Sequence, residues 1–114
     1  AHHPVYSSRN DAVHQRADIQ AHIEPILAAR RPDIYLSGDV HCFEHFRSAD
    51  GRTDYVTCTS GSNAYPVDAV PEALFADGHS GFASLTATKS AIEITMYDKE
   101  GNPLYNLRKE KISR

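Results

Sequence analysis

The residues best suited to chemistry in this 114-residue chain are its seven histidines and the carboxylates near them. Histidine is the commonest metal ligand and the side chain that titrates near neutral pH. The sharpest local pattern lies in residues 37–41, where Asp39 and His41 follow a short apolar run. Residues two apart in extended backbone point the same way, so we expect both side chains to project from the carboxyl end of a strand. A carboxylate and an imidazole placed in this way can bind one cation or bridge two.

A second group of histidines opens the chain. His2 and His3 precede Pro4, which biases the residue before it toward extended backbone. If this segment is the end of a neighbouring strand, His2 meets Asp39 and His41 at the same rim of the sheet. For His3 we expect an exposed, frayed position.

The remaining histidines have simpler interpretations. His14 is equally compatible with a role in a site and with a solvent-facing position at the start of a helix. We expect His22 and His79 to be structural. For His45 and its neighbour Glu44, orientation of His41 is the less favoured alternative.

A helix and a strand must position residues 37–41. Within residues 12–31 a helical stripe is formed by Ile19, Ile23, Ile26 and Leu27. Pro25 predicts a kink, or a helix beginning just before it, because proline removes a backbone hydrogen bond. We expect the helix to end at residues 31–33. The apolar run 34–38 predicts a strand covered on both faces.

A hairpin is predicted next, because Asp50-Gly51 separates two extended runs. This turn places Phe46 opposite Tyr55 and Arg47 opposite Asp54. The same register puts the two cysteines, residues 42 and 58, on opposite faces, so we expect free thiols.

The rest of the chain is predicted to be a loop followed by an antiparallel meander. Residues 61–81 have loop character, with at most a helical turn near 72–75. Alternating apolar residues then predict two strands joined at 89–90, with Leu85 opposite Ile94 and Ala83 opposite Met96. A last strand follows around residues 104–107. Together these elements predict an α+β fold.

Composition excludes several partners. The chain carries 15 acidic and 12 basic side chains, a formal net charge of −3, with no basic cluster suited to nucleic acid or an anionic membrane. No run approaches the ~20 apolar residues of a membrane helix. Two cysteines do not make a disulfide framework, which leaves the cellular compartment open.

Several blocks, taken in order, resemble a known family. They are residues 1–7 (AHHPVYS), a histidine at position 14, 24–27 (EPIL), 33–41 (DIYLSGDVH), 55–63 (YVTCTSGSN) and 81–85 (GFASL). The series is similar to the C-terminal half of calcineurin-like metallophosphoesterases, most of all to the tartrate-resistant, or purple, acid phosphatases. The resemblance implies that residues 1–114 are the C-terminal portion of one domain, part of a four-layer α/β/β/α sandwich whose N-terminal half is absent.

The resemblance also implies a metal site. That family holds two metal ions, iron with iron, zinc or manganese. By its Gly-His-x-Pro block, His2 is implied as a ligand of the divalent ion. By its Gly-His-x-His block, His41 is implied as a ligand of the ferric ion, and Asp39 stands where the family has a histidine. An aspartate there favours harder cations such as Mg²⁺, Mn²⁺ or Ca²⁺. His14 matches a histidine that contacts the phosphate and protonates the leaving group.

The function implied is metal-dependent hydrolysis of a phosphate monoester in the complete protein. The family's other ligands lie in blocks that do not occur in this chain, so we expect the chain alone to be inactive and to need the N-terminal half as its partner. Two alternatives stay open: an alkaline phosphatase or phosphodiesterase of PhoD type, whose Gly-Asp-Val-His block is similar, and a degenerate, non-catalytic domain. Secretion or a lysosomal location is implied by family resemblance only.

Overall fold

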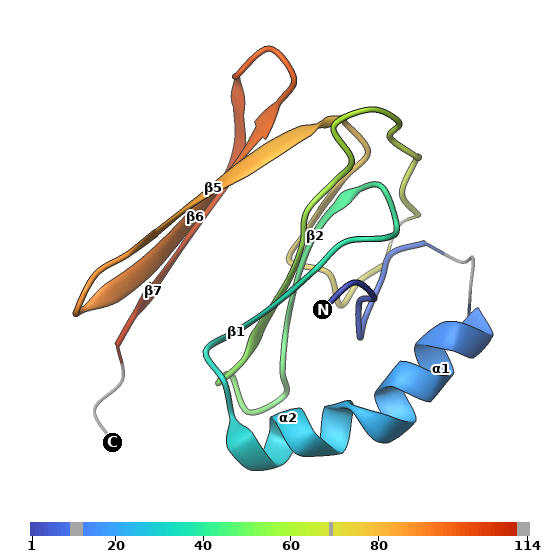
Figure 1. Ribbon diagram of the computed structural model, residues 1–114, viewed down its shortest axis with the longest axis vertical. Helices are drawn as coiled ribbons and strands as arrows, with labels where there is room; N and C mark the ends of the chain where they lie inside the picture. Colours follow the sequence, from blue (N-terminus) through green and yellow to red (C-terminus); the bar gives the residue numbers. More distant parts are fainter. Residues whose placement is uncertain (10–12, 69, 112–114) are drawn as a thin grey trace.

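The computed structural model describes residues 1–9, 13–68 and 70–111, with residues 13–15 described by their backbone alone. The described part forms two helices and seven strands, which are α1 (Val13–His22), α2 (Glu24–Arg30), β1 (Ile34–Ser37), β2 (Phe43–Arg47), β3 (Asp54–Thr57), β4 (Phe75–Asp77), β5 (Gly81–Ala87), β6 (Ala91–Asp98) and β7 (Pro103–Glu110). Figure 1 shows the helices on one side of the sheet that contains β1 and β2, and the β5-β6-β7 sheet on the other. The predicted α+β class is confirmed, in the form of three consecutive layers.

The predicted helix is broken where Pro25 required it. α1 ends at His22 and α2 begins at Glu24, with the proline in its first turn. α2 closes at Arg31, whose left-handed backbone lets its N–H donate to the carbonyl of Leu27 at 2.7 Å. Ile19 and Leu27 pack on the sheet as expected, but Ile26 is 57% exposed. That part of the prediction is wrong, because the helical stripe does not continue unchanged across the break.

The first sheet has the strand order β1-β3-β2-β4. β1 runs parallel to β3, and the hairpin β2-β3 has the predicted register, with Phe46 opposite Tyr55 and Arg47 opposite Asp54. Both cysteines are free, as predicted. β1, however, is half-buried, and Leu36 is exposed, because this strand lies at the edge of the sheet in the described part of the chain.

β4 was not predicted. Residues 72–75 were expected to form at most a helical turn, but residues 71–72 form a turn and the strand Phe75–Asp77 follows. β4 pairs antiparallel with β2, and the N–H of Leu74 donates to the carbonyl of His45 at 2.8 Å. The free edge of β2 therefore decides the conformation of a segment whose local sequence favours a loop.

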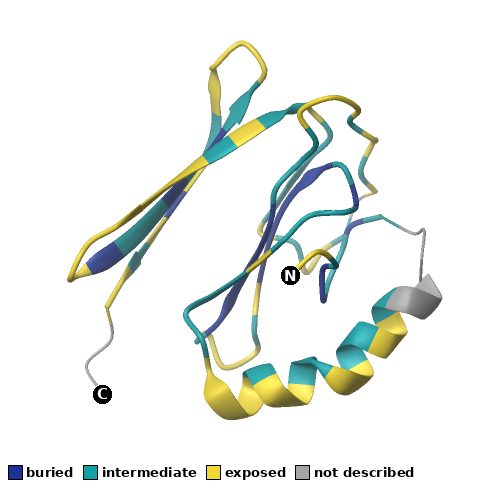
Figure 2. Ribbon diagram, viewed as in Figure 1, coloured by how far each residue is buried: buried dark blue, intermediate teal, exposed yellow. Residues whose placement is uncertain are grey.

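The second sheet is the predicted meander, with strand order β5-β6-β7. Leu85 lies opposite Ile94 and Ala83 opposite Met96, as expected. The core between the two sheets contains Phe43, Val56, Ile94, Met96 and Leu107, and Figure 2 shows the buried residues concentrated on the facing strands. No helix in the described ranges is long and apolar enough to cross a membrane.

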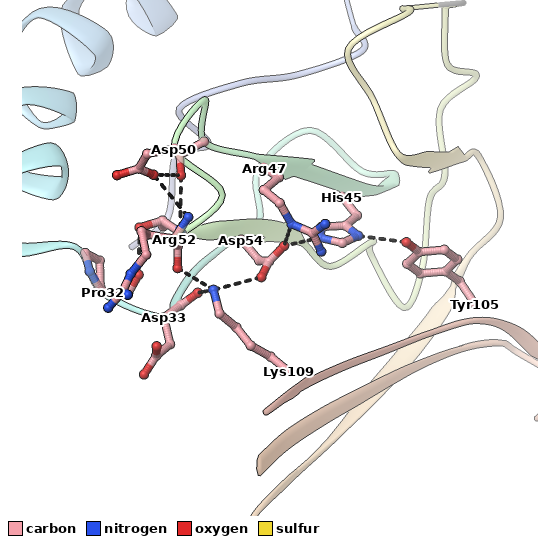
Figure 3. A network of polar contacts seen from close by, with 11 residues as sticks. Pro32, Asp33, His45, Arg47, Asp50, Arg52, Asp54, Tyr105 and Lys109 are labelled. Carbon is pink, nitrogen blue, oxygen red and sulfur yellow. Dashed lines mark hydrogen bonds and ion pairs between the residues drawn. The ribbon is translucent and has the colours of Figure 1, made fainter. Parts of the chain in front are cut away.

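A buried carboxylate joins the two sheets (Figure 3). Asp54, at the start of β3, is 1% exposed. Its Oδ1 accepts hydrogen bonds from His45 Nε2 at 2.7 Å and from Arg47 Nε at 2.8 Å. Its Oδ2 lies 3.0 Å from Nζ of Lys109, which belongs to β7. Burial opposes the charged form of Asp54, but His45, Lys109 and Arg47 outweigh it and hold the pKa of this carboxyl well below its usual range.

The network continues through His45. The imidazole of His45 is 2% exposed, and its Nδ1 lies 2.8 Å from the hydroxyl of Tyr105 on β7. The Nζ of Lys109 donates a second hydrogen bond to the carbonyl of Asp33, at 3.0 Å. Because each buried polar group here has partners on the opposite sheet, the network fixes how the sheets pack on one another.

We expect Asp54→Asn to lower the free energy of unfolding by about 3–5 kcal/mol, the cost of removing one partner from a buried charge cluster. Urea unfolding followed by circular dichroism measures the change. The matched control is Asp50→Asn, because Asp50 pairs with Arg31 at the surface and its loss should have little effect. Equal effects of the two substitutions would show that the buried network does not hold the sheets together.

Because the pKa of Asp54 is lowered in the folded state, we expect the protein to lose stability in acid. A group with a lowered pKa in the folded state stabilises the protein above its unfolded pKa, about 3.9 for aspartate, and loses that contribution as the pH falls further. The difference in urea midpoint between the wild type and Asp54→Asn should therefore be constant near neutral pH and shrink below about pH 4. A difference that stays constant down to about pH 3 would contradict the assignment.

Candidate metal site

Asp39 is the centre of a polar cluster at the carboxyl end of β1. Its Oδ1 lies 3.0 Å from His2 Nε2, and its Oδ2 lies 3.2 Å from His3 Nδ1. The two imidazole rings meet edge to face, with their centroids 4.8 Å apart. Donor atoms of the three side chains all lie within 4.8 Å of one another. The prediction that His2 meets Asp39 at this rim is confirmed, and His3, expected to be frayed, joins them.

Backbone contacts with β1 place the two histidines. The amine of Ala1 donates to the carbonyl of Leu36, and the N–H of Gly38 donates to the carbonyl of His2, each at 2.9 Å. The hydroxyl of Tyr35 donates to the carbonyl of His3, also at 2.9 Å. Residues 1–3 are therefore held alongside the end of β1, although they do not form the neighbouring strand on which that expectation depended.

The segment that follows is anchored in the interior. Val5 is fully buried against Phe46 and Tyr55. Glu44, on β2 and also fully buried, accepts hydrogen bonds through Oε2 from the hydroxyls of Ser7 and Ser8 and from the N–H of Ser8. Its other oxygen, Oε1, is buried and has no hydrogen-bond partner among the residues that the structure describes. Glu44 thus ties residues 7–8 to the sheet, and it does not orient His41.

His41 lies outside the cluster. Its Nδ1 lies 2.8 Å from the carbonyl oxygen of Asn63, and its ring stacks on Tyr65 with centroids 4.6 Å apart. The guanidinium of Arg9 lies 4.7 Å from the centre of the same Tyr65 ring. His41 therefore faces the loop that follows β3, whereas Asp39 faces residues 2 and 3.

The divergence has a backbone cause. Asp39 and His41 adopt left-handed backbone, with φ of 72° and 58°. The alternation of side chains in extended backbone, which predicted that both would project together, does not apply to this turn, so that expectation is wrong. Left-handed non-glycine residues cost about 1–3 kcal/mol each and cluster at functional sites, where the surrounding structure holds them.

The other candidate residues are dispersed. His14 falls in α1, but its side chain lies outside the described residues, so its predicted role is untested. His22 is exposed at the end of α1, and His45 belongs to the Asp54 network. His79 Nδ1 lies 2.6 Å from Asp77 Oδ1, a hydrogen bond that raises the pKa of this exposed imidazole.

The cluster has donors suited to a metal ion. Two imidazole nitrogens and a carboxylate are the ligand types found in catalytic zinc sites, which keep a further position open for water. His2 is 69% exposed at its side chain, so solvent reaches the group. The sequence contained a signal for His3, the extended bias imposed by Pro4. It contained none for the contacts of Glu44 with Ser7 and Ser8, because these residues lie far from Glu44 in the sequence.

Curated relatives cover most of the chain. It is 30% identical over 114 residues to purple acid phosphatase 3 of Arabidopsis thaliana, and 34% identical over 109 residues to purple acid phosphatase 7 of the same plant. These matches cover 95% and 91% of this chain but 30% and 32% of the relatives. The chain thus spans about a third of the length of the curated relatives it matches. No family model matches it.

A solved structure shares the fold. GAP50, described as the anchor in the inner membrane complex of Plasmodium, superposes with a TM-score of 0.82 and 24% sequence identity. The match covers 99% of this chain and 35% of that chain. At this identity the likeness concerns the fold alone.

The left-handed turn at Asp39 generates a stability prediction. Asp39→Gly and Asp39→Ala both remove the carboxylate, but only glycine adopts positive φ without steric cost, so the glycine variant should be more stable by about 1 kcal/mol. Chemical denaturation measures the difference. The control is Ala28→Gly in α2, where glycine should instead lower stability by about 1 kcal/mol. A less stable glycine variant at position 39 would contradict a strained turn.

Proposed function

This chain is related to the purple acid phosphatases, and from that premise we propose that it forms the C-terminal portion, residues 1–114, of a single metal-dependent phosphomonoesterase domain. The identity of 30–34% to four curated phosphatases of that family supports the proposal. The observation that carries it is the meeting of His2 with Asp39 at the carboxyl end of β1, because both occupy positions implied as ligands.

The proposed ligands from this chain are His2, Asp39 and His41, with the remaining ligands supplied by the part of the protein that the chain does not include. Iron with iron, zinc or manganese is the proposed metal pair. The residues fit a metal in part, since two of the three converge and His41 is held by Asn63 and Tyr65. When bound, the ions supply positive charge that stabilises the phosphoryl oxygens in the transition state.

The chain's own residues have distinct roles in this proposal. Asp39 orients the imidazoles of His2 and His3 through its two oxygens. Tyr65, stacked on His41, keeps that ring at the margin of the site. His14 is proposed to protonate the departing alcohol, as an imidazole with a pKa near neutrality can do.

A second candidate function is a non-catalytic binding or structural domain. Two observations favour it: Asp39 stands where the family has a histidine, and the His41 ring is engaged by Asn63 and Tyr65.

Hydrolysis of p-nitrophenyl phosphate by the protein that carries this chain, loaded with iron, zinc or manganese, tests the proposal. We expect turnover that a chelator abolishes, and a loss of at least about 100-fold in kcat/KM for Asp39→Ala and for His41→Ala, since even outer-shell changes cost 10–100-fold. His79→Ala, at an exposed histidine remote in sequence, is the control and should leave turnover unchanged. The 114-residue chain alone should be inactive.

Each outcome decides between the candidates. Absence of turnover in the metal-loaded protein would overturn the enzymatic proposal and favour the non-catalytic one. Turnover of bis-p-nitrophenyl phosphate in preference to the monoester, with an alkaline pH optimum, would favour a phosphodiesterase or alkaline phosphatase.

A further inference from the structure

We propose that His2, His3 and Asp39 bind a single divalent transition-metal ion, with Zn²⁺ the best match, and that this chain builds the site without His41. The inference deepens the proposed function and rests on its assignment of His2 and Asp39 as ligands, but it requires neither catalysis nor ligands from outside the chain. His3 is the new ligand. Neither the spacing of the histidines nor the family resemblance assigned it a role.

Two of the donor contacts already suit a small ion. The contacts of the two Asp39 oxygens with the imidazoles measure 3.0 and 3.2 Å. In a tetrahedral zinc site with bonds of about 2.0–2.1 Å, neighbouring donors lie about 3.3 Å apart. With one donor atom from each residue, the separations extend to 4.8 Å, so the side chains must approach one another by up to about 1.5 Å to share one ion.

The ligands are held in place from both sides. The carbonyl of His2 accepts from Gly38, and that of His3 accepts from Tyr35, so the backbone of both histidines is fixed to β1. On the other side, the left-handed backbone at Asp39 directs its carboxylate back over residues 2 and 3. Because these contacts fix the backbone of the three residues before any ion binds, metal binding costs little backbone conformational entropy.

The donor set selects the class of metal. Mg²⁺ and Ca²⁺ prefer oxygen ligands, and one carboxylate offers too few of them. Two imidazoles with one carboxylate suit Zn²⁺ or a neighbouring first-row ion. The exposure of His2 leaves room for water at a further position.

His41 provides an internal comparison. It is two residues from Asp39, yet its Nδ1 is engaged by the carbonyl of Asn63 and its ring by Tyr65. The proposed site therefore includes His3 and excludes His41, although the family resemblance implied His41 as a ligand.

Isothermal titration of the protein that carries this chain with Zn²⁺ tests the inference. We expect one ion to bind at least about 10-fold more weakly in His2→Ala, His3→Gln and Asp39→Asn. The matched controls are His22→Ala, which removes an exposed histidine, and His79→Ala, which removes a histidine that contacts the half-buried Asp77. Both should bind as the wild type does. Mg²⁺ should give no measurable heat.

A spectroscopic measurement separates the loss of a metal ligand from the loss of folding. Co²⁺ in place of Zn²⁺ should give visible absorption bands of a site with nitrogen and oxygen ligands, lost in His3→Gln while the circular dichroism stays unchanged. Unaltered affinity in His3→Gln, or a loss in His41→Ala as large as in His2→Ala, would overturn the inference. So would an equal loss in His79→Ala, which would indicate surface histidines acting independently. One bound Zn²⁺ without phosphatase turnover in the complete protein would support this site while contradicting the proposed function.

Discussion

The candidate site depends on one constraint, the attachment of residues 1–9 to a sheet whose first strand, β1, begins only at Ile34. His3 and Asp39 are separated by 36 residues, and so are Ser8 and Glu44. Backbone hydrogen bonds to the end of β1 set the position of the histidines, and burial of Val5 and the contacts of Glu44 prevent the segment from lifting off. Such contacts between distant residues are made at an entropic cost that the buried core must offset.

Two buried carboxylates lie on neighbouring strands, Glu44 on β2 and Asp54 on β3, and each holds a different part of the structure. Asp54 faces the second sheet, and its charge is balanced by Lys109 of that sheet and by Arg47 of the neighbouring strand β2. Glu44 faces the N-terminal segment, where hydroxyl and N–H groups of Ser7 and Ser8 surround one of its oxygens. Buried carboxylates are costly unless they have such partners, so each one specifies which segment packs against its side of the sheet. Together they link the cluster of His2, His3 and Asp39 to the layered core.

The turn after β1 determines which chemistry the site can perform. Left-handed backbone at Asp39 and His41 sends the two side chains in different directions, one to the imidazoles of residues 2 and 3 and the other to the loop at Asn63 and Tyr65. The turn thus separates two groups of histidines, with His2 and His3 on one side and His41 on the other. A single-ion site needs only the first of them, whereas the proposed phosphatase uses both and adds ligands from the rest of the protein.

Local patterns determined much of the fold. Pro25 predicted the helix break, Asp50-Gly51 predicted the register of the hairpin, and alternating residues predicted the pairing of Leu85 with Ile94, because turn chemistry and side-chain period act over a few residues. The resemblance to the phosphatases also followed from the sequence alone. Only the tertiary structure decided that β4 is a strand, that His3 joins the cluster, that Glu44 holds the N-terminal segment and that His41 turns away. Each of these depends on a free strand edge, a buried polar group or a left-handed turn, features created by residues that are distant in sequence and adjacent only after folding.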